Sequence, residues 1–306
     1  MSVNKRTEII KLGDEVVLYL PITSKINKYS TGYLSISGSL PSKYSATAYN
    51  LYSRSVISNK IRYFDLTPYI DEDKQIPDVL YVEPHIRFHH DYTSTNYNPF
   101  GSNFSIIFKI VFFNKDDLAN LWKIKSYEAD TNERKWGNEE IDYYFTTLFD
   151  QIFYMYNTIH IYNPKPKNPS LYVDFQLDDN SKWYISLDDF NFSFGNEYKV
   201  VVSFDLTNTS NPVNIWIDNE QKTVTLQPYS PIPSGRIIQP KSLLSYIGVG
   251  SIGGVFDHLG YLLQKGSCIY IRDFIIVKET VNSSNVSYYS DLVNNFLYPK
   301  RILSKK

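Results

Sequence analysis

Cysteine and alanine are both scarce in this chain of 306 residues. Cys268 is the single cysteine, which excludes a disulfide framework and a zinc site built from several thiolates. Only four alanines stand beside 27 tyrosines and 18 phenylalanines. Because alanine is the best helix former and aromatic residues prefer pleated surfaces, this balance predicts strands rather than helices.

An excess of one charge is missing as well. The 31 lysines and arginines nearly balance the 32 aspartates and glutamates, which leaves a net charge of −1. A nucleic-acid partner requires a basic surface, so we expect none. No stretch approaches the run of about 18 apolar residues that would span a membrane, so we expect no membrane insertion. Residues 1–14 lack the apolar core and cleavage site of a secretory signal, which favours synthesis and folding in a host cytoplasm.

Alternation of apolar and polar residues predicts an all-β fold. In residues 197–205, Tyr198, Val200, Val202 and Phe204 share one face of a strand. Strands this frequent, separated by polar turns, are typical of two packed antiparallel sheets. The other predicted strands are residues 15–22, 32–40, 60–66, 79–90, 103–113, 159–163, 170–177, 182–187, 213–217, 223–226, 244–250 and 268–279.

Helix is expected in three short segments. Residues 114–124 begin with Asn114, a good N-cap. Residues 138–156 place several apolar side chains at helical spacing, although their aromatic and β-branched content favours a strand. Residues 290–303 read as an amphipathic tail helix that ends before Pro299.

Residues 198–226 resemble the central hairpin of the concanavalin A-like and laminin G-like jelly-roll superfamily. Residues 200–205 match the alternating apolar strand that ends in aspartate, and residues 213–218 match the strand that follows it. Asn219 replaces the glycine that is usual in the turn. Residues 246–254 and 266–279 resemble later strands of the same superfamily.

The resemblance implies an antiparallel jelly-roll β-sandwich over residues 15–280. An insertion at about 114–160 would carry the short helices. Residues 1–14 would form an N-terminal arm and residues 281–306 a C-terminal tail. A fold of this kind does not by itself imply an activity.

Catalytic residues are hard to find. In the glycoside hydrolases of the superfamily that this chain resembles, acidic residues lie two apart on one strand. They do so because an acid and a base must flank the same glycosidic bond. The acidic runs at residues 71–75 and 138–142 fall instead in a polar turn and in a predicted helix. We therefore expect no catalytic residue and a protein that is not an enzyme.

Calcium is the one cofactor that the sequence suggests. The superfamily resemblance implies calcium held by aspartate and asparagine oxygens, and Asp178, Asp179, Asp188 and Asp189 lie in acidic turns that fit such ligands. Ordinary polar turns have the same composition. The expectation is therefore no cofactor, with calcium as the alternative.

Three aromatic residues are candidates for glycan contact. Trp216 lies on the strand at 213–217, and Trp183 and Tyr184 lie on the strand at 182–187. Aromatic rings offer an apolar face on which a sugar can stack. The alternative is that the large rings pack inside the sandwich.

Three functions remain. The leading hypothesis is a non-enzymatic structural protein of a virion, such as a bacteriophage head decoration, fibre or tail accessory protein, with itself and other virion proteins as partners. It follows from a tyrosine-rich sandwich without a signal peptide, because exposed tyrosine is typical of interfaces. The alternative is a carbohydrate-binding module for cell-surface glycans. A polysaccharide hydrolase is third.

Overall fold

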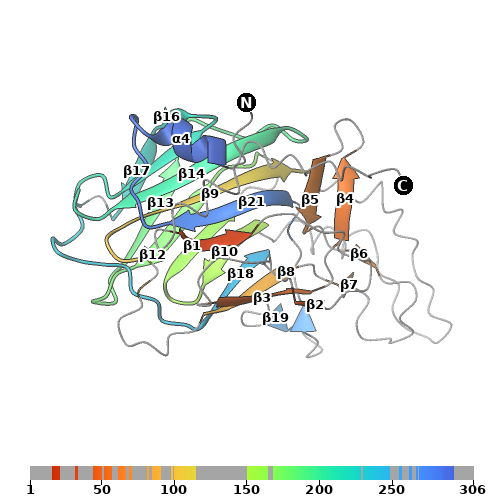
Figure 1. Cartoon of the computed structure of the whole chain (residues 1–306). Helices are drawn as coiled ribbons and strands as arrows, with labels where there is room; N and C mark the ends of the chain where they lie inside the picture. The colour runs from red at the N-terminus through yellow and green to blue at the C-terminus, as the bar shows by residue number, and fades with distance from the viewer. Residues whose placement is uncertain are drawn as a thin grey trace, which may run out of the picture.

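The computed structural model describes residues 98, 100–114, 150–164, 168–228, 230–248, 267 and 269–292, together with Leu66 and a set of strands elsewhere. In the strands before residue 98, the side chains of Ile86, Arg87 and Phe88 are also described. All strand pairs within this part of the chain are antiparallel. They form two large sheets and two short two-stranded pairs (Figure 1).

Sheet A contains eight strands among the described residues. The long strands β9 and β14 pair over nine residues, and β21 lies on the other side of β9. The most apolar run of the sequence therefore crosses the centre of this sheet, as its composition predicts. In order, the strands are β16 (Glu220–Lys222), β15 (Val213–Ile217), β14 (Glu197–Asp205), β9 (Asn103–Phe112), β21 (Ile269–Val277), β5 (Ile61–Asp65) and β4 (Tyr52–Val56), with β1 (Val16–Leu20) also paired to β21.

Sheet B contains nine described strands. In order, they are β17 (Val224–Gln227), β13 (Lys182–Leu187), β12 (Tyr172–Gln176), β11 (Ile159–Asn163), β10 (Asp150–Met155), β18 (Leu244–Gly248), β8 (His85–His90), β3 (Tyr44–Tyr49) and β2 (Gly32–Tyr33). The short pairs are β6 (Tyr69–Ile70) with β7 (Tyr81–Val82), and β19 (Val255–Phe256) with β20 (Leu262–Leu263).

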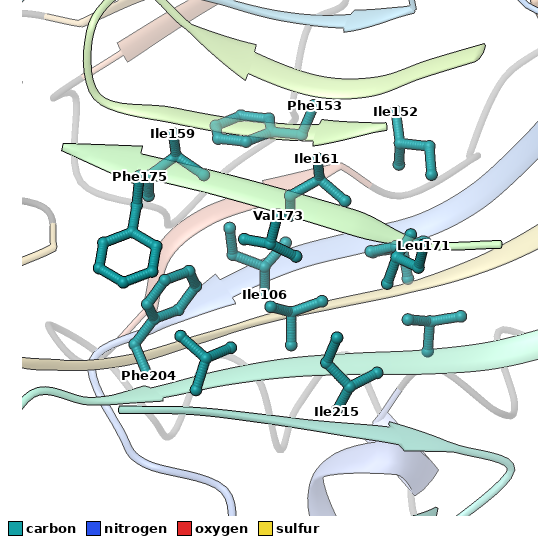
Figure 2. Close-up of a cluster of buried hydrophobic side chains, with 14 of the residues drawn as sticks. Ile106, Ile152, Phe153, Ile159, Ile161, Leu171, Val173, Phe175, Phe204 and Ile215 are labelled. Carbon is teal, nitrogen blue, oxygen red and sulfur yellow. The ribbon is translucent and has the colours of Figure 1, made fainter. Parts of the chain in front are cut away.

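One hydrophobic core joins the two sheets. Figure 2 shows side chains of sheet B, including Phe153, Ile161 and Val173, packed toward those of sheet A. The ring of Phe204 in β14 stacks on Phe104 at 4.3 Å between centroids and meets Phe175 of β12 edge-on at 5.8 Å. Burial of such rings is the main favourable contribution to folding, so the two sheets stabilise each other.

The outer face of sheet A carries a second apolar cluster. Helix α4 (Val286–Leu292) lies over β14 in Figure 1. Its residues Val286 and Tyr289 pack with Trp216 and neighbouring side chains of the sheet. The Val281 backbone N–H donates hydrogen bonds to the hydroxyls of Ser105 and Ser203, at 3.0 and 2.8 Å. This C-terminal segment is therefore part of the packed structure.

The predicted fold class is confirmed, and so is the pairing of the two central strands. The strand predicted at 223–226 does not return beside 213–217, because β16 takes that place. Strands β14 and β15 pair in register from Val200↔Ile217 to Phe204↔Val213. Asp218 and Asn219 have φ angles of 52° and 72°, which asparagine and aspartate tolerate in tight turns. After β16, the chain crosses over, because β17 pairs with β13 of sheet B.

The helix prediction for residues 138–156 is wrong over residues 150–155. Those residues form β10, in which Phe153 and Met155 face the core. Their aromatic and β-branched content, together with pairing to β11 and β18, outweighs the helical spacing. Residues 138–149 and residues 115–124 of the other predicted helix lie outside the described residues. The tail helix begins at Val286, earlier than expected.

Candidate binding surface

Aromatic side chains gather on the outer face of sheet B. Strands β11, β12, β13 and β18 bury alternate residues over most of their length, so the residues between them point away from the core. In β10, Tyr154 is the one residue that is not buried. Five of the ten residues that are not buried on these strands are tyrosines. The tyrosine face is defined here as Tyr154, His160, Tyr162, Tyr172, Asp174, Tyr184 and Tyr246.

Strand register places five members of this face in one row across the sheet. The row passes from strand to strand through directly opposed residues, which are neighbours on one face. It runs Tyr184↔Asp174↔His160↔Tyr154↔Tyr246 and continues to Arg87 of β8. Tyr162 and Tyr172 form a parallel second pair beside it.

The rings of the tyrosine face support one another. His160 stacks on Tyr162 with centroids 4.3 Å apart and an angle of 17° between the planes. Tyr154 meets His160 edge-on at 5.0 Å, and Tyr162 meets Tyr172 at 5.8 Å. The Tyr162 hydroxyl donates to Asp174 Oδ1 at 3.4 Å. Rings packed in this way lose little freedom when a ligand binds, so the surface is preorganised.

Burial sets the charge of the face. It lowers the pKa of His160 to about 3, so this imidazole is neutral at physiological pH. It raises the pKa of Asp174 to about 6, although the hydrogen bond from Tyr162 and the charge of Lys182 act in the opposite direction. Burial also raises the pKa of the Tyr154 and Tyr162 hydroxyls, which stay protonated. At pH 7 the face is thus mostly uncharged hydroxyls around one carboxylate.

Exposed apolar side chains lie at the β13 side of the tyrosine face and in the loops beside β10 and β18. Tyr184 is 46% exposed on the β13 side. Tyr156, which follows β10, is 53% exposed, and Leu243, which precedes β18, is 48% exposed. A hydrogen bond from the Lys241 N–H to the Thr158 hydroxyl, 2.9 Å long, holds the loops of these two residues together.

Of the three residues predicted to contact a glycan, two are buried and one is exposed. Trp183 is only 6% exposed and belongs to the main core, and Trp216 is 3% exposed beneath α4. Neither indole presents a face to solvent, so the packing alternative describes both. Tyr184 points the other way from Trp183 on the same strand and joins the tyrosine face.

The predicted calcium ligands do not converge. Asp178 and Asp179 both face Arg236, at 3.8 and 3.2 Å, so a guanidinium already lies beside these carboxylates. Asp188 accepts a hydrogen bond from Thr225 at 2.8 Å, and Asp189 is exposed. Within the described ranges, no three histidine, cysteine or acidic side chains are placed to hold a metal ion. Calcium binding stays an untested prediction.

A buried charge network on the outer face of sheet A was not foreseen. Arg272 makes a two-pronged pair with Glu197 at 2.7 and 2.6 Å, and Lys109 lies 3.1 Å from the same carboxylate. Arg272 also pairs with Asp273 at 2.7 Å. Burial raises the pKa of Asp273 to about 6, against the charges of Arg272 and Lys109. Lys109, Glu197 and the adjacent pair Arg272 and Asp273 lie far apart in sequence, and strand register brings the three strands together.

The acidic runs at 71–75 and 138–142 lie outside the described residues. No helix in the described part of the chain is long and apolar enough to cross a membrane.

Comparison with known proteins gives likeness of fold. No protein-family model matches the sequence, and no curated protein matches it. Among solved structures, the binding domain of Paraclostridial Mosquitocidal Protein 1 has a TM-score of 0.52 at 14% identity, covering 91% of this chain and 52% of that one. The binding domain of botulinum neurotoxin serotype C1 has 0.49 at 12% identity, covering 92% and 53%. The serotype G binding domain has 0.47 at 14% identity, covering 85% and 50%.

The chain spans about half the length of the solved chains that it matches. At these identities the likeness bears on the fold alone, and of these three the mosquitocidal protein's domain alone reaches a TM-score of 0.5. It agrees with the antiparallel sandwich described above.

Proposed function

We propose that this chain is a non-enzymatic binding domain that recognises carbohydrate through the tyrosine face of sheet B. The observation that carries the proposal is the row of opposed residues from Tyr184 to Tyr246, on an outer face that the core does not use. It is a polar and aromatic surface on rigid strands.

The chemistry of the face suits a hydroxyl-rich ligand. Tyrosine rings give apolar contact to the C–H groups of a sugar, and their hydroxyls donate and accept hydrogen bonds. Asp174 adds a strong acceptor beside Tyr162. His160 is neutral, so the cations of this face, Lys182 and Arg87, lie at its two ends and not within the row. Such a surface can orient a polar ligand but holds no activated nucleophile.

The fold likeness is in keeping with a binding role. The matching region of the mosquitocidal protein is itself described as a binding domain. This chain spans about half of that domain. The proposal therefore concerns the sandwich described here and not the ligands of the whole mosquitocidal protein.

A glycan panel with matched variants tests the proposal. Binding of the purified chain to immobilised glycans is measured for the wild type, Tyr184→Ala, Tyr172→Ala and the control Tyr288→Ala. Tyr288 is 47% exposed and Tyr184 46%, but Tyr288 lies on α4 over the other sheet. We expect weaker binding to the longer glycans for the first two variants and unchanged binding for the control. Binding by no member of the panel would reject the proposal.

The expectation of a virion assembly protein stays a prediction. The same tyrosine face could contact another protein subunit, because tyrosine is enriched in protein interfaces. Light scattering on a size-exclusion column separates the two ideas. A discrete oligomer that Tyr184→Ala dissociates would favour assembly through this face.

A further inference from the structure

We infer that the ligand of the tyrosine face is a neutral, linear oligosaccharide that lies across the strands, from Tyr184 on β13 to Tyr246 on β18. The inference rests on the proposed carbohydrate-binding function and specifies the shape and charge of the ligand.

Strand spacing gives the direction. Five neighbouring strands of sheet B, in the order β13, β12, β11, β10 and β18, each contribute one side chain to the row. Neighbouring strands lie about 4.8 Å apart. The four steps from Tyr184 to Tyr246 therefore cover about 19 Å. Each step is comparable to the length of one pyranose ring, so successive sugar units can meet successive strands.

Along the strands the aromatic surface is short. On β13, Tyr184 is flanked on its face by Lys182 and Ser186. On β11 the aromatic stretch is His160 and Tyr162, and on β12 it is a single tyrosine beside Asp174. A chain laid along a strand would leave the aromatic residues after about one unit, whereas a chain laid across the strands stays on them.

The charge of the row indicates a neutral ligand. Asp174 occupies an interior position of the row, next to His160, which is uncharged at neutral pH. The cations of this face lie at its two ends: Lys182, which acts on Asp174, is exposed at the β13 side, and Arg87 lies beyond Tyr246 on β8. A carboxylated or sulfated unit placed at the row would meet the Asp174 carboxylate, and a like charge there opposes binding. A neutral sugar can instead donate a hydroxyl to it.

A chain-length series tests the inference. Calorimetry at pH 7.5 measures the affinity of the wild type for cello-, malto- and N-acetylchito-oligosaccharides of one to six units. For the type that binds, we expect affinity to rise about ten-fold or more from two to four units and to level off after five. An acidic series, oligogalacturonides of the same lengths, should bind at least ten-fold more weakly than the neutral series.

Substitutions at the two ends of the row make the test specific. Tyr184→Ala and Tyr246→Ala should each remove most of the gain between two and four units while the affinity for the disaccharide stays within about two-fold. Tyr288→Ala should keep the whole series unchanged. The exposed position of Tyr184 makes that variant informative even if Tyr246→Ala fails to fold.

The outcomes distinguish the two proposals. Full affinity for a mono- or disaccharide, with no effect of the row-end variants while Tyr172→Ala still weakens binding, overturns the extended cross-strand ligand but leaves carbohydrate binding by the tyrosine face intact. Tighter binding of the acidic series overturns the neutral ligand. Absence of binding to every glycan tested rejects the proposed function itself, and this inference with it.

Discussion

Asp174 is the acidic side chain of the tyrosine face, and its environment makes it sensitive to pH. Its ordinary pKa of 3.8 rises to about 6 in the folded protein, because burial disfavours the charged form. The folded state thus binds a proton that the unfolded state does not bind between about pH 4 and 6. The stability that this residue contributes is full below pH 3.8 and is lost as the pH rises through 6.

Asp174→Asn should therefore stabilise the protein at pH 7.5 and lose most of that advantage near pH 4.5. Asparagine removes the buried charge and keeps an acceptor for Tyr162. We expect a gain of about 1–2 kcal/mol in the free energy of unfolding at pH 7.5, less than the full effect of a two-unit shift because the carboxylate remains partly hydrated. Urea unfolding at the two pH values measures it. The exposed Asp189→Asn is the control, and an equal gain for Asp174→Asn at both pH values would contradict the expectation.

Glu197 is the acid that neutralises both Lys109 and Arg272. Glu197→Gln should lower the free energy of unfolding by about 2–3 kcal/mol, because it leaves the buried Lys109 ammonium without the carboxylate 3.1 Å away and leaves Arg272 with Asp273 alone. Denaturant unfolding at pH 7.5 gives the value. The control is Glu220→Gln, which removes an exposed pair with Lys222 and should have little effect. Equal effects of the two substitutions would show that the network of sheet A contributes nothing beyond a surface pair.

At the scale of elements, the C-terminal segment covers the outer face of sheet A. Val286 is 5% exposed at the start of α4, and the next residue, Ser287, is exposed. Val286→Asp should release the segment, because a charge would have to be buried against Trp216. We expect hydrogen exchange across residues 280–292 to accelerate, including the Val281 amide, while β14 stays protected.

The same helix supplies its control. Ser287→Asp places the same charge one residue later, in solvent and near the helix N-terminus, where an anion is tolerated. Exchange in residues 280–292 should stay at the wild-type rate. Acceleration throughout β14 in Val286→Asp would mean that the helix is needed for the whole sheet and is not a separable cover.

The strands were predictable where one face alone is buried. Residues 159–163 and 182–187 alternate clearly and form β11 and β13. The same alternation separates Trp183 from Tyr184 and could have identified His160, Tyr162 and Asp174 as outward residues. The row itself could not be derived, because it depends on the order and register of β10 to β13 and β18, which local sequence does not encode. β10 was missed for a related reason: its pairing partners decide between helix and strand.

At the scale of the whole molecule, the two sheets share one core. Phe204 of sheet A contacts Phe175 of sheet B, and the surrounding cluster takes residues from both sheets (Figure 2). A core continuous across both layers predicts that neither sheet is stable without the other, so the described sandwich should unfold in a single cooperative transition.

Two tryptophans allow this cooperativity to be measured. Trp183 reports on the core side of sheet B and Trp216 on sheet A beneath α4. In two variants that each keep one of them, with the other three tryptophans replaced by phenylalanine, fluorescence follows urea unfolding. Phe204→Ala removes a fully buried ring and should lower the unfolding free energy by about 3–4 kcal/mol. Because the core is shared, that loss should be equal at both probes. A larger loss at Trp216 than at Trp183 would show that sheet A can loosen while sheet B, with its tyrosine face, stays folded.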